Sequence, residues 1–194
     1  MSAEDTAEDA AASSDDDQSV DEDQLEEYNE MLEQLGAYPD KMIINSLSMV
    51  AEDFAESAKG AAGIYQCIRA LLLSASVTAE RKLPLVYVVD SILKNVRGRF
   101  IPLIESDAAE WISAVHGHIS DEQRAKLRKV LDTWRQGAIF SETSLTEMGR
   151  CFADSDKQAA AKRASAENVT GIGRNVSAGA SIMCLVYAHA RMSY

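Results

Sequence analysis

The chain has few of the residues that build disulfide frameworks, zinc sites or membrane spans. Its 194 residues include three cysteines, three prolines and ten glycines, and 6% of the residues are aromatic. Cys67, Cys151 and Cys184 are far apart and odd in number, so no disulfide framework or zinc spacing is present. No apolar run is long enough to cross a bilayer, and the acidic N-terminus has no signal-peptide pattern. These absences favour a reducing compartment and predict no membrane association.

Basic residues are missing from residues 1–40, which hold fifteen acidic residues and no lysine or arginine. Residues 41–194 hold sixteen acidic residues against nineteen basic ones, so the net charge of −12 comes from the N-terminal part. A mildly basic body suits a phosphorylated peptide partner, but the charge balance alone does not identify the partner. Residues 1–22 have almost no bulky apolar side chains, which predicts an acidic disordered tail.

Apolar residues recur at helical spacing along most of the chain, and no run has the two-residue period of a strand. Ser120 and Gln123 have the spacing of a capping box, and Ser76 or Thr78 can cap the helix that follows them. The folded domain is predicted at 23–157, with a poorly defined tail at 158–194. Within this all-α domain, we predict helices over about 25–35, 39–54, 58–73, 79–96, 99–115, 120–137 and 144–153.

The helix that carries residues 83–96 is apolar around most of its circumference, which places it at the centre of an all-helical domain. Five polar residues interrupt it on one side. At 100° per residue, four of them fall within about a third of a turn and the fifth lies at the edge. The polar groups of such a strip must form hydrogen bonds within the protein or be open to a ligand. We call it the polar strip; it consists of Tyr87, Asp90, Ser91, Lys94 and, at the edge, Asn95.

Residues 87–96, Tyr-x-x-Asp-Ser-Ile-x-Lys-Asn-Val, closely resemble the central helix of the CTD-interacting domain, or CID. Residues 43–47 before this helix and 126–134 after it agree in order and spacing, so the resemblance covers about residues 24–157. It implies a right-handed superhelical stack of about eight helices, similar to VHS and ENTH domains. Many members have a small residue directly after the Asn-Val pair, where this chain has Arg97 and then Gly98.

The resemblance implies a nuclear protein that binds the phosphorylated heptad-repeat tail of the largest subunit of RNA polymerase II. The chain is particularly similar to the N-terminal domain of the pre-mRNA cleavage factor subunit that couples mRNA 3′-end processing to transcription termination. Cleavage and polyadenylation factors, and also mRNA, are then further candidate partners. Two other functions stay open from the sequence: a VHS- or ENTH-like membrane-trafficking adaptor, and an RNA-binding helical scaffold.

Each residue of the polar strip has a functional and a structural interpretation. The resemblance implies that Asp90 accepts the tyrosine hydroxyl of the repeat, whereas the sequence alone permits an i,i+4 salt bridge to Lys94. Asn95 can clamp a peptide backbone or bond within its own helix end. Ser91 can permit close approach of a ligand, and Tyr87 can pack on a proline of the peptide or belong to the core.

Lys129 is the candidate phosphate ligand. It lies five residues before Trp134, where several family members have an arginine that holds the phosphate of the second-position serine. Lysine keeps the charge but loses the planar fork, and a solvated base in a basic run is the alternative. Lys41 is a weaker candidate for peptide contact.

An enzyme is not predicted, because the chain has no nucleophile elbow, paired-acid motif or lysine-bearing phosphate loop. His116 and His118 lack a third ligand at useful spacing, and residues i and i+2 of a helix point apart. We therefore expect both histidines on the surface, and neither a metal nor a cofactor.

Overall fold

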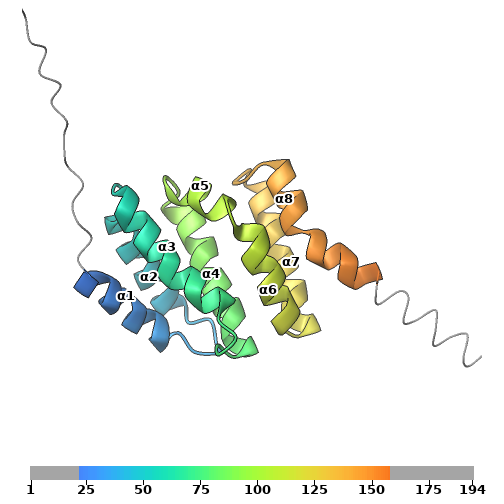
Figure 1. The fold of residues 1–194 in the computed structure, drawn as a ribbon, viewed down its shortest axis with the longest axis horizontal. Helices are drawn as coiled ribbons and strands as arrows, with labels where there is room; N and C mark the ends of the chain where they lie inside the picture. Colours follow the sequence, from blue (N-terminus) through green and yellow to red (C-terminus); the bar gives the residue numbers. More distant parts are fainter. Residues whose placement is uncertain (1–21, 158–194) are drawn as a thin grey trace, which may run out of the picture.

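The computed structural model describes residues 22–157, and every regular element in that range is a helix (Figure 1). The all-α stack of about eight helices predicted from the sequence is confirmed. The tails predicted at 1–22 and 158–194 lie almost entirely outside the described residues. The helices are α1 (Glu22–Gln34), α2 (Lys41–Asp53), α3 (Ala58–Leu73), α4 (Ala79–Asn95), α5 (Phe100–Glu105), α6 (Ala108–His118), α7 (Asp121–Gln136) and α8 (Glu142–Met148), followed by helical residues 150–157.

Helix α4 is the centre of the stack, as its apolar circumference predicts. It packs against α2, α3, α5, α6 and α7. Burying each aliphatic side chain of this kind is worth about 1.5–3 kcal/mol relative to leaving it exposed, so α4 supplies much of the core. Its buried apolar residues are Leu83, Pro84, Leu85, Val86, Val88, Val89, Ile92 and Leu93.

Several side-chain hydrogen bonds between the helices join residues about 40 to 50 positions apart in sequence. Gln123 bonds to the carbonyl of Ala79 and Trp134 to Asp90, both 44 residues apart, so α4 and α7 run in the same direction. Ser48 and Ser91, 43 residues apart, join α2 to α4. These bonds tie together helices that lie two or three elements apart along the chain, in addition to the packing between consecutive helices.

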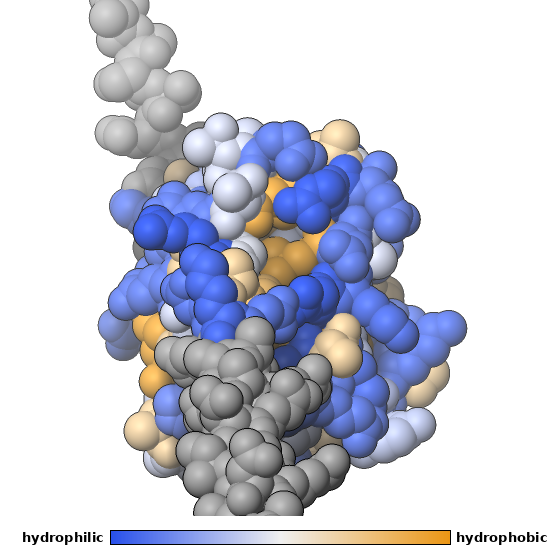
Figure 2. All heavy atoms as spheres, turned by 90° about the vertical axis from the view of Figure 1, so that its right-hand side faces the viewer, coloured by the Kyte–Doolittle hydropathy of each residue, from blue (hydrophilic) through white to orange (hydrophobic). Residues whose placement is uncertain are grey.

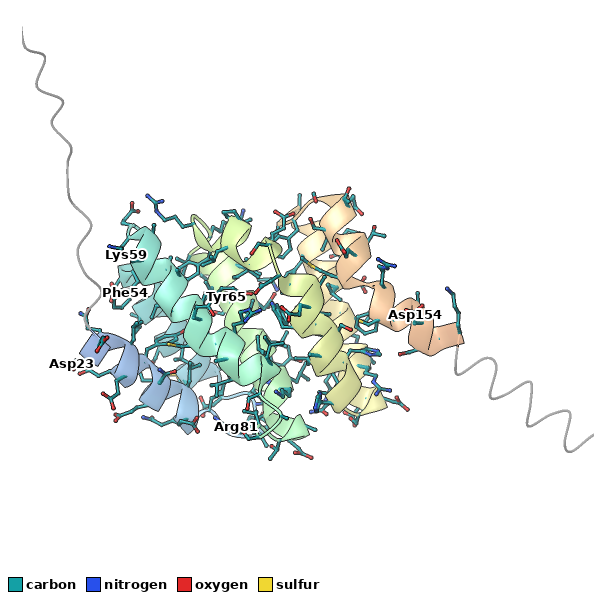
Figure 3. All side chains as sticks on the ribbon, in the orientation of Figure 1. Asp23, Phe54, Lys59, Tyr65, Arg81 and Asp154 are labelled. Atoms are coloured by element: carbon teal, nitrogen blue, oxygen red, sulfur yellow. The ribbon has the colours of Figure 1, made fainter. Side chains whose placement is uncertain are left out.

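The predicted helix over 99–115 is wrong, because the chain breaks between α5 and α6 at Ser106 and Asp107. The Asp107 carboxylate accepts hydrogen bonds from the Tyr65 hydroxyl and from Arg69 Nε on α3, and the Trp111 indole donates to the Tyr65 oxygen at 3.1 Å. Tyr65 points from α3 toward this break (Figure 3). A partner some forty residues away therefore fixes a bend that local periodicity does not reveal.

Some of the predicted helix ends are confirmed and others are wrong. The capping box of Ser120 and Gln123 is confirmed at the start of α7, and Gly137 ends that helix. Thr78 occupies the first cap of α4 but makes no side-chain cap bond. The helix predicted over 144–153 is wrong in its bounds: α8 begins after Ser141, whose hydroxyl caps it, and a turn at Gly149 separates it from residues 150–157.

A buried lysine closes the end of α3. Lys82, in the first turns of α4, is 1% exposed, and its ammonium group donates to three backbone carbonyls. These belong to Leu71, Leu72 and Ser74, at 2.9, 2.8 and 2.6 Å. They are among the carbonyls that a helix end leaves without intrahelical partners. Burial lowers the pKa of Lys82, while the three acceptors favour its charged form.

The far end of the stack, beyond α6, is mostly polar outside the atoms drawn in grey (Figure 2). Hydrophilic side chains dominate there, and apolar ones show mainly in a recess and along one edge. Terminal units of helical stacks commonly present such a face to solvent. Within residues 22–157, no helix has the length and hydropathy needed to cross a membrane.

His116 is buried, at 5% exposed, so its predicted place on the surface is wrong; only His118 is exposed. The His116 ring packs edge-on against Phe152, with ring centroids 4.7 Å apart, and His116 Nε2 lies 3.4 Å from the Ser155 hydroxyl. Burial lowers the pKa of His116, and the charges of Arg124 and Arg128 lower it further. Asp156 and Asp121 act in the opposite direction without reversing the shift.

We expect acid to weaken the docking of residues 150–157 through His116. The unfolded chain takes up the imidazole proton near pH 6.5, whereas the folded protein takes it up only at lower pH. This contribution to the free energy of unfolding is therefore complete above about pH 6.5 and is lost as the pH falls below it. Urea unfolding at pH 7.5 and 5.5 measures the loss, which should be smaller in His116→Gln and unchanged in His118→Gln. Equal pH dependence in all three proteins would contradict the assignment.

Candidate functional site

The polar strip lies between α2 and α7, with its side chains reaching both helices. Asp90 bonds to Trp134 of α7, and Ser91 bonds to Ser48 of α2. Tyr87, Asp90 and Ser91 are half-buried, whereas Lys94 and Asn95 are exposed. The structure thus brings together all five residues that the sequence grouped and leaves them accessible along one side of α4.

Asp90 is held through both of its carboxylate oxygens. The Trp134 indole nitrogen donates to Oδ1 at 2.8 Å, and the Lys94 ammonium donates to Oδ2 at 2.7 Å. The Asp90 side chain is 18% exposed. The salt bridge that the sequence permitted is confirmed, and the bond from Trp134 was missed. A carboxylate has about four acceptor positions, so Asp90 keeps capacity for a further hydroxyl donor.

Ser91 is the middle of a chain of side-chain hydrogen bonds from α2 to the end of α4. Its hydroxyl lies 2.7 Å from that of Ser48 and accepts from Asn95 Nδ2 at 3.1 Å. The bond from Asn95 stays within its own helix, as the structural interpretation of this residue allowed. Asn95 Oδ1 has no protein partner within the described residues, which leaves a fixed acceptor facing the surface. Ser48, which positions Ser91, gave no sequence signal.

Helix α7 adds positive charge beside Tyr87. Burial raises the pKa of the Tyr87 hydroxyl, and the nearby charge of Lys126 acts in the opposite direction. Lys126 also forms a surface ion pair with Glu122 at 2.8 Å. The proximity of Lys126 to Tyr87 shows which edge of α7 borders the strip.

Lys129 lies one turn after Lys126 and is exposed. The four other bases of α7 are paired: Arg124 with Asp121 at 2.8 Å, Lys126 with Glu122 at 2.8 Å, Arg128 with Asp156 at 3.0 Å, and Arg135 with Glu142 at 3.2 Å. Lys129 has no acidic partner within residues 22–157. No neighbouring carboxylate therefore neutralises the charge of Lys129, so this charge is available to bind an anion.

The model of the CID domain family matches residues 26–148 of this chain. The chain belongs to the CID family. The CID family is one of protein-interaction domains.

Solved structures agree with this CID fold. The crystal structure of the RPR domain of Pcf11 is 19% identical, with a TM-score of 0.60, and the match covers 67% of this chain and 98% of that one. The yeast Nrd1 CID in complex with Sen1 NIM1 is 17% identical, with a TM-score of 0.53, and the match covers 66% and 96%. The same yeast CID in complex with Sen1 NIM3 is 19% identical, with a TM-score of 0.51 and coverage of 66% and 97%.

The α2 side of this CID carries an apolar wall that sequence reasoning missed. Tyr38, Met42 and Met49 are 81, 75 and 67% exposed, and they are the large apolar residues that stand out to solvent in the described part. Met42 and Met49, seven residues apart, lie on one face of α2, away from buried Leu47, and Tyr38 lies in the non-helical segment just before this helix. A hollow of about 310 Å³ continues from this wall to the end of α4; its lining is Asn45, Ser48, Met49, Glu52, Asn95 and Val96.

Lys41, the weaker candidate, is the first residue of α2 and is exposed beside Met42. It lies on the helix that carries the apolar wall, at the end where the chain enters it. Within the described range, no three histidine, cysteine, aspartate or glutamate side chains gather as a metal site. This face offers apolar contact on α2, side-chain acceptors on α4 and positive charge on α7.

Proposed function

We propose that this CID binds the phosphorylated heptad-repeat tail of RNA polymerase II in the nucleus, in mRNA 3′-end processing and transcription termination. The observation that carries the proposal is Asp90, a carboxylate held in place by Trp134 and Lys94 and still reachable from solvent. A tyrosine hydroxyl that donates to it makes a charge-assisted hydrogen bond. In this reading, cleavage and polyadenylation factors and mRNA are further partners of the assembly.

The surroundings of Asp90 suit the other parts of the repeat. Asn95 Oδ1 can accept a backbone N–H of a peptide that has no partner strand, and the exposed Met42 and Met49 offer apolar contact to its prolines. Ordering a flexible peptide costs entropy, so we expect modest affinity for one repeat. Several repeats on one tail add avidity without any new contact.

The two other functions have distinct signatures. An RNA-binding scaffold would bind RNA with a steep salt dependence and would bind repeat peptides weakly or not at all. A trafficking adaptor would bind anionic vesicles selectively. Titration of the protein with repeat peptides, unphosphorylated or phosphorylated at the second, fifth or seventh position, tests the proposal directly. Binding to RNA or vesicles without binding to any repeat peptide would refute it.

Lys129 supplies the test of phosphate recognition. We expect Lys129→Glu to weaken binding of the peptide phosphorylated at the second position by about tenfold, and that of the unphosphorylated peptide much less. Lys129→Arg should keep or improve binding, because the guanidinium fork matches a phosphate. Added salt should reduce the difference, since the contact is exposed.

Lys157→Glu is the matched charge reversal, because Lys157 is exposed and lies outside α2, α4 and α7, the helices that carry the candidate site. It should change both affinities little. If Lys129→Glu lowers the two affinities equally, Lys129 provides only general attraction and the phosphate is held elsewhere.

A further inference from the structure

Glu52 lies at a place in α2 where a negative charge is unfavourable. It is in the last turn of this helix, and no basic residue accompanies it there. The C-terminal end of a helix carries partial negative charge, so an acidic side chain destabilises this end slightly, whereas a basic one stabilises it. A residue that breaks a local rule without an evident structural gain is a candidate for a role in binding.

The Glu52 carboxylate has no cationic partner in the part of the chain that the structure describes. The two bases at the end of α4 make other contacts. The Lys94 ammonium pairs with Asp90 at 2.7 Å, and Arg97 Nε lies 3.5 Å from the Lys94 carbonyl oxygen. Glu52 is exposed, so its negative charge is available to a cation that a binding partner brings.

Glu52 lines the hollow that the ends of α2 and α4 share. Asn95 lines the hollow from α4, and the bond from its Nδ2 to Ser91 at 3.1 Å fixes its Oδ1 as an acceptor. Met49 and Val96 add apolar surface. The lining of the hollow therefore combines oxygen acceptors with apolar side chains and includes no basic residue.

The chemistry of this lining fits the side chain of a lysine or arginine. Such a side chain buries its aliphatic stem on apolar surface and keeps its charged end at polar groups. Met49, which is 67% exposed, can cover the stem, and Glu52 and Asn95 Oδ1 can accept from the charged end. The volume of about 310 Å³ is at the lower end of the range of about 300–1,000 Å³ for ligand pockets, which suits one side chain of a peptide. The negative ends of α2 and α4 favour the same positive charge.

The hollow adjoins the polar strip on the side of α2. Ser48 lines the hollow and bonds to Ser91 of the strip at 2.7 Å, and Asn95 belongs to both. Asp90, which bonds to Trp134 of α7, lies five residues before Asn95, or about 7.5 Å along the helix axis. A peptide covers this distance within a few residues, whether it is extended or turned. A peptide held at Asp90 therefore has a nearby residue within reach of the hollow.

We propose that this hollow is a subsite for a lysine or arginine of the bound peptide, and that Glu52 recognises the charge of that residue. The inference rests on the proposed function and adds a specificity to the same face of the protein. The preferred ligand is a variant repeat that carries a basic residue close to the tyrosine bound by Asp90. Acetylation of a lysine at that position removes its charge and with it the preference.

A lysine scan of the peptide tests the subsite without any assumption about the conformation of the bound peptide. A two-repeat peptide receives lysine at one position at a time, the tyrosines excepted, and norleucine at the same position is the uncharged control. We expect lysine to bind about three- to fivefold more tightly than norleucine at one position close to a tyrosine, and less than about twofold more tightly elsewhere. Acetyl-lysine at that position should bind like norleucine. Glu52→Gln should abolish the preference for lysine, and Glu52→Lys should replace it with a preference for glutamate.

Glu56→Gln is the matched control, because Glu56 is exposed just after α2 and does not line the hollow. It should leave every ratio of lysine to norleucine affinity unchanged. If the wild-type protein binds none of the peptides, the proposed function fails, and this inference fails with it. If the protein binds them but lysine gives no gain at any position, or an equal gain at every position, the subsite alone is wrong. The subsite is also wrong if Glu56→Gln reduces the gain as much as Glu52→Gln does.

Discussion

Lys82→Met is expected to lower the free energy of unfolding by about 2–4 kcal/mol. Methionine fills similar space but donates nothing, so the carbonyls of Leu71, Leu72 and Ser74 lose their buried partner. A loss of this size corresponds to a fall in melting temperature of roughly 5–15 °C for a domain of this length. Thermal and urea unfolding, followed by circular dichroism, measure it.

The matched control is Lys157→Met, at a lysine that is 80% exposed in its side chain. Exposed substitutions of this kind change stability by about 0.5 kcal/mol or less. If Lys82→Met is as stable as the unchanged protein, the cost of burying the ammonium equals the value of its three hydrogen bonds. The cap at the end of α3 would then contribute specificity rather than stability.

Asp90→Ala is expected to reduce the affinity for a repeat peptide about ten- to a hundredfold, because the tyrosine hydroxyl loses its acceptor. It should also cost about 1–3 kcal/mol in stability, since the buried Trp134 indole is left without a partner. Calorimetric titration and a melting curve measure the two effects. The structure shows the contacts of Asp90 with Lys94 and Trp134, and its contact with the tyrosine hydroxyl is the proposal that the titration tests.

Asp90→Asn separates these roles. An asparagine Oδ1 can still accept from Trp134, so most of the stability should return while the charge is lost. A peptide in which phenylalanine replaces the repeat tyrosine completes a double-mutant cycle. The wild-type protein should bind the tyrosine peptide more tightly than the phenylalanine peptide, and this difference in affinity should be much smaller for both Asp90 variants. Equal discrimination in all three proteins would mean that the tyrosine hydroxyl binds elsewhere.

The polar strip could be predicted from the sequence because its members share one helix. Helical periodicity alone places Tyr87 to Asn95 on one side of α4, and the capping box of Ser120 and Gln123 is equally local. The Trp134 bond to Asp90 could not be predicted in this way, because the two residues are 44 positions apart. For the same reason the role of Lys82 could not be predicted. From the sequence alone Lys82 has the pattern of a surface base, and only the structure shows that the end of α3 packs on it.

The break at Asp107 shows why periodicity predicted one helix where there are two. The apolar spacing from Leu103 to Val115 is compatible with a continuous helix, and only the bonds to Tyr65 and Arg69 on α3 stabilise the bend. The apolar wall of Met42 and Met49 was missed for another reason. Their spacing fits a helix face, but the sequence does not tell which apolar residues of α2 face solvent.

The limited sequence separation of the bonds between helices has a consequence for folding. Most of these bonds join residues about 40 to 50 positions apart, and none of those described joins the first helix to the last. A chain organised in this way does not have to close one long loop before any contact forms, so its folding can spread from a central nucleus. Protection from hydrogen exchange should therefore be strongest in α4 and decrease stepwise toward α1 and residues 150–157.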